Sequence, residues 1–264
     1  MRKRCVGLAL GLLFVPSAAW AGAWTLPEGT GQWLAMLTAA TSTSYFDGSG
    51  LASIPRYNKF EAQALIEYGI TDRLTGIFKP ELQSIDIAAP VDAQRSGLGY
   101  TEFGARYGFL QSKDWVVSGQ ATLLVPGTTD TSNPAAIGYT DVEADLRVLV
   151  GHNFTLGSMP AFFDLEVAQR ERTAGYPSEF RTDATLGVQV LPRWLLLTQS
   201  FNVISEGAGN TAYDGGSYEY YKLQLSAVYS LTPTWQLQGG GYVTYAGGNA
   251  LQENGMIFGV WHQF

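Results

Sequence analysis

Apolar and polar residues alternate with a period of two along much of the chain. In the stretch 57–70, the even positions from Phe60 to Ile70 are apolar, whereas Lys59, Glu61 and Glu67 occupy odd positions. Successive side chains of a β-strand point to opposite faces. The pattern therefore predicts a strand with one face in an apolar environment and the other in water.

The same alternation predicts twelve strands. Short connections at 71–73, 111–114, 155–159, 191–193 and 231–234 join pairs of strands at one end. Connections at the other end are mostly longer, with polar loops expected at 47–56 and 88–98. An even number of strands with short turns on one rim is typical of outer-membrane barrels, in which an exposed sheet edge is excluded by lipid. The predicted fold is an all-β, membrane-embedded, antiparallel up-and-down β-barrel of about 12 strands, at 33–46, 57–70, 74–87, 99–109, 115–126, 139–154, 160–173, 180–190, 194–204, 218–230, 235–246 and 255–264.

The first residues have the pattern of a secretory leader. Arg2, Lys3 and Arg4 precede an apolar run, and Ala19-Trp20-Ala21 is a small-x-small cleavage motif. We expect residues 1–21 to be a signal peptide that is removed, leaving the barrel at 22–264, although Ala21-Gly22-Ala23 also fits a cleavage site. The apolar run is too short for a membrane anchor.

Removal of the leader changes the charge and the available chemistry. The 16 basic residues fall to 13 against 23 acidic ones, so the formal charge goes from −7 to −10. This sign disfavours nucleic-acid binding. Cys5 lies in the leader, so the remaining chain has no cysteine for a disulfide, a thiolate metal site or a nucleophile.

Aromatic residues occur at the predicted strand ends. Trp33, Trp115, Trp194 and Trp235 each begin a strand near the rim of short turns. Indole groups partition to the membrane interface, so these residues predict a periplasmic aromatic girdle. In the alternative, a secreted β-sandwich, the same aromatic residues would be core residues, but no remaining segment offers a continuous apolar partner surface.

The last predicted strand ends on an aromatic residue. Met256, Phe258, Val260, His262 and Phe264 share one face of it. The pattern resembles the C-terminal strand of bacterial outer-membrane barrels, and this resemblance implies that Phe264 belongs to the signal recognised during assembly.

Two short stretches resemble a more particular family. Residues 67–75 (EYGITDRLT) and 101–108 (TEFGARYG) are similar to stretches of outer-membrane barrels assigned to phenol-degradation pathways, relatives of hydrophobic-compound uptake channels. The resemblance implies passage of small aromatic or apolar molecules. Long-chain uptake channels also carry an N-terminal plug, but here only about ten residues separate the leader from the first strand, so no full hatch domain is expected.

Charged residues concentrate on the predicted lumen face of strands two to four and six to eight. Such residues either brace a narrow barrel as ion pairs or form an electrostatic lining that selects solutes. The wall of strands nine to twelve is more neutral, with Thr198, Ser200 and Asn202 among its expected lumen residues. Beside Gly240, Gly255 and Gly259 we expect an open slot along this wall. The candidate lumen-lining residues are Glu61, Glu67, Lys79, Glu81, Glu102, Arg106, Asp141, Glu143, Asp145, Arg147, Asp164, Glu166, Arg170, Arg172, Arg181, Asp183, Gln236, Gln238 and Tyr242.

Enzymatic chemistry has little support. Outer-membrane phospholipases need a Ser–His pair near the outer leaflet, whereas His152 and His262 fall near the periplasmic ends of their strands. These two histidines are also too separated for a metal site. The acidic run Asp141-x-Glu143-x-Asp145 has ligands suitable for Ca²⁺ or for pairing with arginines such as Arg106, Arg147 and Arg181, and pairing is favoured. We expect no catalytic residue, cofactor or bound metal.

The sequence thus predicts an outer-membrane channel for passive diffusion or uptake of a small solute, hypothetically aromatic or hydrophobic. The alternative is a non-conducting structural or adhesive barrel that acts through its extracellular loops, and a lipid-modifying enzyme comes third. The expected partners are outer-membrane lipid, the barrel assembly machinery and a small solute. We expect a monomer.

Overall fold

The protein is an all-β structure. The computed structural model describes residues 22–127, 133–135, 141–209 and 217–264, so the predicted leader lies outside the described residues. No helix long and apolar enough to cross a membrane occurs in the described part of the chain. The strands are β1 (Gly31–Phe46), β2 (Leu51–Thr71), β3 (Leu74–Lys79), β4 (Glu81–Ile87), β5 (Ala93–Leu98), β6 (Tyr100–Gln111), β7 (Trp115–Pro126), β8 (Glu143–Leu156), β9 (Met159–Arg172), β10 (Glu179–Leu191), β11 (Trp194–Ser205), β12 (Glu219–Ser230), β13 (Trp235–Gly248), β14 (Ala250–Leu251) and β15 (Asn254–Gln263).

These segments form twelve barrel strands because three strands are interrupted. β3 and β4 are separated by Pro80, which has no N–H to donate to the ladder. The carbonyl oxygen of Pro80 still accepts a 3.2 Å hydrogen bond from the backbone N–H of Ala64. Gly99 separates β5 from β6, and residues 252–253 separate β14 from β15. The predicted count of twelve is confirmed.

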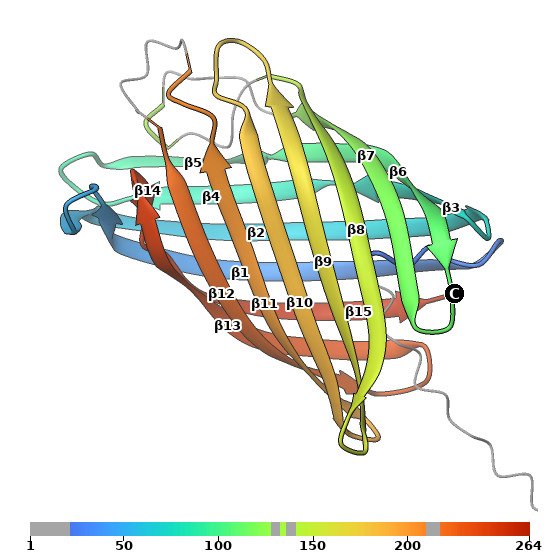
Figure 1. Ribbon diagram of the computed structural model, residues 1–264. Helices are drawn as coiled ribbons and strands as arrows, with labels where there is room; N and C mark the ends of the chain where they lie inside the picture. The colour runs from blue at the N-terminus through green and yellow to red at the C-terminus, as the bar shows by residue number, and fades with distance from the viewer. Residues whose placement is uncertain (1–21, 128–132, 136–140, 210–216) are drawn as a thin grey trace, which may run out of the picture.

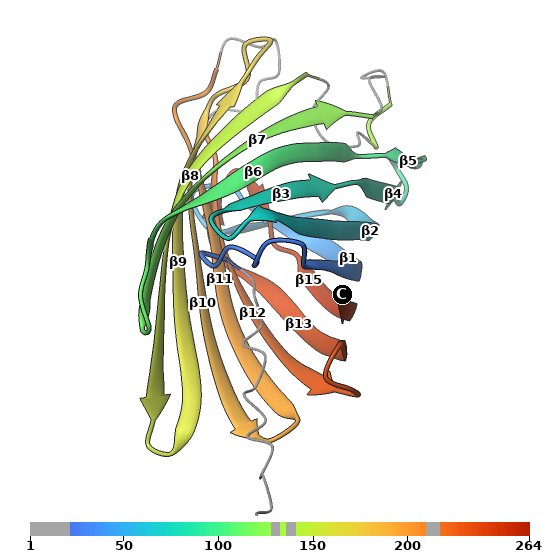
Figure 2. The same ribbon diagram turned by 90° about the vertical axis from the view of Figure 1, so that its right-hand side faces the viewer.

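The sheet closes through the first and last strands. β1 pairs antiparallel with β2 on one side and with β15 on the other. The remaining neighbours follow chain order, so every barrel strand has two partners, as Figures 1 and 2 show. Closure removes the unpaired edge that a lipid environment does not tolerate.

Side chains alternate between the two faces of the wall. Leu146 of β8 is 61% exposed on the outside, whereas its neighbour Asp145 is 1% exposed on the inside. An apolar exterior on a closed antiparallel barrel is the structure of an outer-membrane protein that spans the bilayer many times.

The facing prediction was wrong for one strand. On β11, Thr198, Ser200 and Asn202 fall in the outward set with the exposed Leu196 and Ile204, and the inward residues are Leu197, Gln199, Phe201, Val203 and Ser205. The register shows why, because Thr198 pairs with the outward Leu186 and Gln199 with the inward Thr185. The weakly polar outward residues had suggested a lumen face by composition alone.

The long-loop rim also differs from the prediction. β2 begins at Leu51 and β5 occupies 93–98, so the expected loops 47–56 and 88–98 shrink to 47–50 and 88–92. β5 pairs along its whole length with β4, which extends this hairpin beyond its predicted end. β8 begins at Glu143 rather than 139, and residues 136–140 lie outside the described part of the chain.

The segment before β1 folds into the barrel. Residues 22–30 run from the start of β1 towards β9, as the dark-blue trace in Figure 2 shows. Ala23 is fully buried and Leu26 is nearly so. The sequence had suggested only a short polar segment before the first strand. Because its residues are buried inside the barrel, we call residues 22–30 the internal plug.

Candidate functional site: the barrel interior

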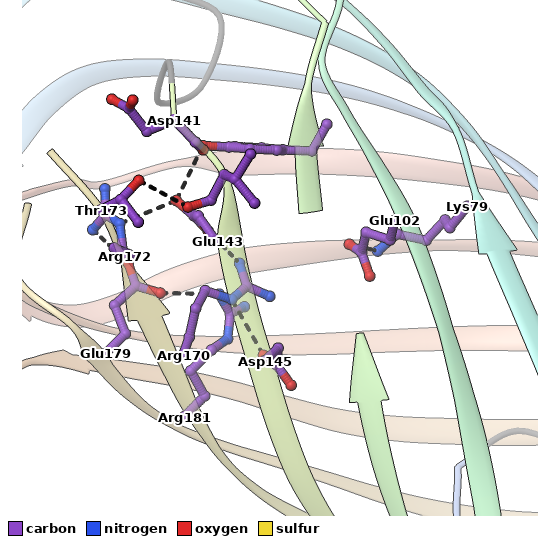
Figure 3. Close-up of polar contacts among 12 residues, drawn as sticks. Lys79, Glu102, Asp141, Glu143, Asp145, Arg170, Arg172, Thr173, Glu179 and Arg181 are labelled. Carbon is purple, nitrogen blue, oxygen red and sulfur yellow. Dashed lines mark hydrogen bonds and ion pairs between the residues drawn. The ribbon is translucent and has the colours of Figure 1, made fainter. Parts of the chain in front are cut away.

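An ion-pair network covers the inner face of β8, β9 and β10 (Figure 3). The β8–β9 register places Asp145 directly opposite Arg170, whose Nε lies 3.2 Å from the Asp145 carboxylate. Arg147 pairs with Asp145 at 3.2 Å, with Asp183 at 2.7 Å and also with Glu166. Opposite charges on neighbouring strands stabilise the pairing and hold the side chains against the wall.

The network continues towards the long-loop rim through Arg172. Glu143 is the cross-strand partner of Arg172, and its carboxylate lies 3.1 Å from the guanidinium. Arg172 also pairs with Glu179 at 3.1 Å, and Glu179 pairs with Arg181 at 3.2 Å. Glu143 and Asp145 of the acidic run are thus engaged with arginines: with Arg147, as expected, and with Arg170 and Arg172 in place of the expected Arg106 and Arg181. Pairing with arginine, which the sequence favoured over Ca²⁺ binding, is therefore found at Glu143 and Asp145.

Two further pairs lie on the wall formed by β2, β3 and β6. Lys79 lies 2.6 Å from Glu102, its register partner on β6. Arg106 pairs with Glu67 at 2.8 Å, and both side chains are almost completely buried. Removal of two charges from water is costly unless their hydrogen bonds are satisfied. The Arg106 guanidinium meets this need by also donating to Gln120.

A second cluster, the lysine–tyrosine cluster, contains Lys59, Lys222, Tyr220, Tyr242 and Glu253. Glu253 lies 2.6 Å from Lys222 and 3.6 Å from Lys59, so one carboxylate joins two ammonium groups. Lys222 Nζ lies 5.1 Å from the ring centre of Tyr220 and 5.3 Å from that of Tyr242. Both distances are within the range of cation–π attraction. This part of the lumen places carboxylate-paired ammonium groups and phenol rings side by side.

Neighbouring groups lie close to the glycines that had predicted a slot along the neutral wall. The ring of Tyr242 lies over Gly255, where any Cβ would overlap it. Met36 and Gln238 cover Gly259 at contact distance, and the backbone of β12 lies against Gly240. Gly255 and Gly259 therefore accept large neighbours and do not by themselves mark empty space, and the slot stays a prediction.

The internal plug centres on Trp24. Its indole covers Gly151 of β8 and meets the ring of Phe162 edge to face, with ring centres 5.7 Å apart. It packs against a buried apolar cluster that includes Leu197, Val228 and Trp261. These residues face inward at the short-turn end of their strands. The barrel therefore has a small hydrophobic core at its periplasmic end.

Backbone hydrogen bonds fix the plug to several strands. Arg106 donates to the Trp24 carbonyl at 3.0 Å, and Ser118 donates to the Ala23 carbonyl at 2.8 Å. The N–H of Leu26 donates to Thr75 at 2.8 Å. A buried segment without regular structure needs such partners for its peptide groups. The inward polar residues of β3, β6 and β7 supply them.

All of the sequence-predicted lumen candidates are buried or half-buried. Apart from the groups already described, Glu61 lies 3.7 Å from Lys59, Gln83 donates to Glu81, and Gln238 donates to Ser226 while accepting from Trp261. Gln236 is buried, and the carbonyl of Asp141 accepts from Tyr100. Asp164 accepts from the Ala23 N–H and contacts Glu166, at the edge of the arginine network.

Sequence reasoning missed Glu179, Glu253 and the Trp24 cluster. Glu179 continues the inward alternation with Arg181 and Asp183, which would have revealed it if the strand had been started one residue earlier. The inward apolar residues Leu149, Phe162, Leu197 and Val228 were a signal for an internal core. Glu253 left no such signal because it lies at a strand interruption.

The aromatic residues at the short-turn rim form contacts on the outer surface. Trp33 and Trp235 meet edge to face at 5.5 Å, and His262 stacks on Trp235 at 4.2 Å. His152 stacks on Trp115 at 4.0 Å and contacts the Asp114 carbonyl through Nδ1. Trp194 packs against Tyr229 at 4.8 Å. Both histidines are thus held among aromatic rings at the short-turn rim, whereas the Ser–His pair of an outer-membrane phospholipase lies near the outer leaflet.

The fold places the protein in the class of twelve-stranded outer-membrane barrels, and solved structures of outer-membrane barrels are similar to it. The COG4313 outer membrane channel from Pseudomonas putida F1 matches with a TM-score of 0.74 and 16% identity, over 92% of this chain and 98% of that one. The NanC porin matches with a TM-score of 0.59 and 10% identity, over 87% and 98%. The translocator domain of the autotransporter NalP from Neisseria meningitidis matches with a TM-score of 0.51 and 10% identity, over 90% of each chain.

At these identities the likeness establishes the fold. No family model matches the sequence, and no curated protein sequence matches it.

Proposed function

We propose that the protein is an outer-membrane channel for a small solute, with aromatic molecules as the preferred class. The observation that carries the proposal is the closed barrel whose interior is lined by ordered polar groups from most of its strands. Similarity to an outer-membrane channel and to a porin supports this role.

The lysine–tyrosine cluster supports the aromatic class. A planar solute binds favourably against the Tyr220 and Tyr242 rings, and a weakly acidic hydroxyl is attracted by Lys59 and Lys222. On β10, two strands along the wall from β12, Arg181 Nε and Asp183 Oδ1 are buried without a hydrogen-bond partner among the described residues. They offer a donor and an acceptor to a polar substituent.

The internal plug affects how solutes leave the lumen at its periplasmic end. It crosses the periplasmic end and is held by one indole and a few hydrogen bonds rather than by a folded domain. Twelve strands enclose a lumen between that of filled eight-stranded barrels and that of wide sixteen-stranded porins. A short internal segment therefore has a large effect on the open cross-section.

Single-channel conductance of the refolded protein in planar bilayers tests the channel role. We expect a measurable wild-type conductance that increases in Trp24→Ala, because the indole no longer covers Gly151. Trp115→Ala is the matched control, since Trp115 lies on the outer surface and should leave conductance unchanged. If neither the wild type nor Trp24→Ala conducts although both are folded, the structural or adhesive alternative replaces the channel.

Block of the current by phenol and by cyclohexanol, two solutes of similar size, tests the aromatic preference. We expect stronger block by phenol, and we expect Tyr242→Ala to reduce the difference. Tyr245→Ala is the control, because Tyr245 lies on the outside of the same strand and is 55% exposed. Equal block by the two solutes in the wild type contradicts the aromatic preference while leaving the channel role intact.

A further inference from the structure

Asp164 is a buried carboxylate that forms no direct ion pair with a described side chain, although the charge of Arg106 acts on it from a greater distance. It lies on the inner face of β9 and is 2% exposed. None of the ion pairs formed among the described residues involves it. Its neighbour Glu166 pairs with Arg147 and lies in hydrogen-bond contact with Asp164, which adds a second acid. A buried charge of this kind is strongly unfavourable unless a positive group is nearby.

The plug places its first described residue against this carboxylate. The N–H of Ala23 donates to Asp164 Oδ1 at 2.8 Å. A Cβ built on Gly22 would overlap all three atoms of the Asp164 carboxyl group, so the Cα of Gly22 is in contact with it and only glycine fits. The nitrogen of Gly22 is one bond of about 1.46 Å beyond that Cα.

We infer that the leader is cleaved between Ala21 and Gly22 and that the new α-ammonium group of Gly22 forms a buried ion pair with Asp164. Hydrolysis adds water across this peptide bond, leaving a carboxylate on Ala21 and an amine on Gly22 that binds a proton near neutral pH. The ammonium group supplies the direct ion-pair partner that the described side chains do not. The cleavage step rests on the predicted signal peptide and not on the channel proposal.

The alternative cut after Ala23 is disfavoured by the same contacts. It would remove Ala23, which is completely buried and whose N–H and carbonyl are bonded to Asp164 and Ser118. The chain would then begin at Trp24, and Asp164 would lose the Ala23 N–H. Cleavage after Ala21 retains every described contact of the plug. Leader removal therefore creates the charged group that fastens the plug in the lumen.

The first test is the intact mass and the N-terminal peptide of the barrel purified from the outer membrane. We expect a chain that begins at Gly22. A chain that begins at Trp24, or that keeps the leader, overturns the inference.

The second test measures acetylation of the α-amine by N-hydroxysuccinimidyl acetate near neutral pH, followed by mass spectrometry. Only the neutral amine reacts, so an ion pair that raises the pKa of the α-amine by one unit slows the reaction roughly tenfold. We expect this slowing in folded wild-type protein relative to protein unfolded in urea. Equal rates in the folded and unfolded wild type overturn the ion pair.

Variants locate the partner of the α-amine. Asp164→Asn should restore fast acetylation in protein that remains heat-modifiable, and Asp164→Glu, which keeps the charge, should retain slow acetylation. Asp114→Asn, in an exposed turn at the same rim, is the control and should leave the rate slow. If folded Asp164→Asn reacts as slowly as the wild type, burial alone protects the amine and the ion pair is not formed. If Asp164→Asn does not fold, the pH dependence of acetylation in the folded wild type decides the question, because an ion pair moves the titration of the α-amine to higher pH and burial alone moves it to lower pH.

Discussion

Phe264 and Gly31 join the two ends of the barrel wall. The N–H of Gly31 donates to the Phe264 carbonyl at 2.8 Å, and the N–H of Phe264 donates to the Gly31 carbonyl at 2.9 Å. The ring of Phe264 lies over Gly31, where any Cβ would overlap it. The last residue of the sequence therefore completes the seam between β15 and β1.

Deletion of Phe264 should impair assembly of the barrel. The deletion removes both hydrogen bonds and the ring that covers Gly31, whereas secretion depends on the leader and should continue. We expect a lower fraction of heat-modifiable protein in the outer membrane, measured on unheated gels. Phe154→Ala, at the end of β8 on the same rim, is the control. Accumulation of the truncated protein as a soluble, folded periplasmic species would contradict its identity as a membrane barrel.

Arginine substitutions should distinguish the two faces of the wall. Leu146→Arg places a charge in the lipid near mid-strand and should lower the free energy of unfolding by about 2–4 kcal/mol. Thr185→Arg, on the inner face of β10, should have a much smaller effect because the lumen is polar. Denaturant titration in liposomes measures both, and equal losses are incompatible with the assigned facing.

The corrected facing of β11 has its own test in the adjacent pair Thr198 and Gln199. Thr198 points outward, so Thr198→Arg should be more destabilising than Gln199→Arg, which points into the lumen beside Gln224. The two positions lie at nearly the same depth, so the comparison isolates the face. The opposite order in liposome unfolding would restore the facing that the polar composition suggested.

Tyr242 and Gly255 should be energetically coupled. Gly255→Ala forces the Tyr242 ring out of its place, and overpacking of this kind costs about 1–3 kcal/mol. In a Tyr242→Ala background the same substitution should cost much less, because the space is free. Gly239→Ala is the control, since a Cβ there would meet nothing within 4 Å. Additive effects in the double-mutant cycle would show that the ring does not occupy this space.

The Arg106–Glu67 pair should be sensitive to loss of one partner. Arg106→Met leaves Glu67 buried without its cation and should lower the free energy of unfolding by about 3–5 kcal/mol. Additional replacement of Glu67 by Gln should recover part of this loss, because the buried charge is gone. Arg73→Met, in an exposed turn, should have little effect. If Glu67→Gln gives no recovery, the loss arises from the Arg106 contact with the plug instead.

The sequence by itself determined the architecture. The alternation from Phe60 to Ile70 shows, from neighbouring residues alone, which side chains face lipid and which face the lumen. Short turns such as 71–73 force the strands that they join to be antiparallel. Lipid excludes an open edge, so closure and the count of twelve followed without tertiary information. The grouping of charges on β8, β9 and β10 also followed, since alternation places them on one face.

Only the tertiary structure decided what fills the barrel. Packing across the lumen depends on distances between residues far apart in the sequence, as between Trp24 and Gly151 or Ala23 and Asp164. A glycine in the sequence is equally consistent with an empty space and with close packing of a neighbouring ring. The ring of Tyr242 packs over Gly255, so this glycine allows close packing. Register decided the face of Thr198, because polar side chains on this strand can face outward when they hydrogen-bond one another, as Asn202 does with Thr182.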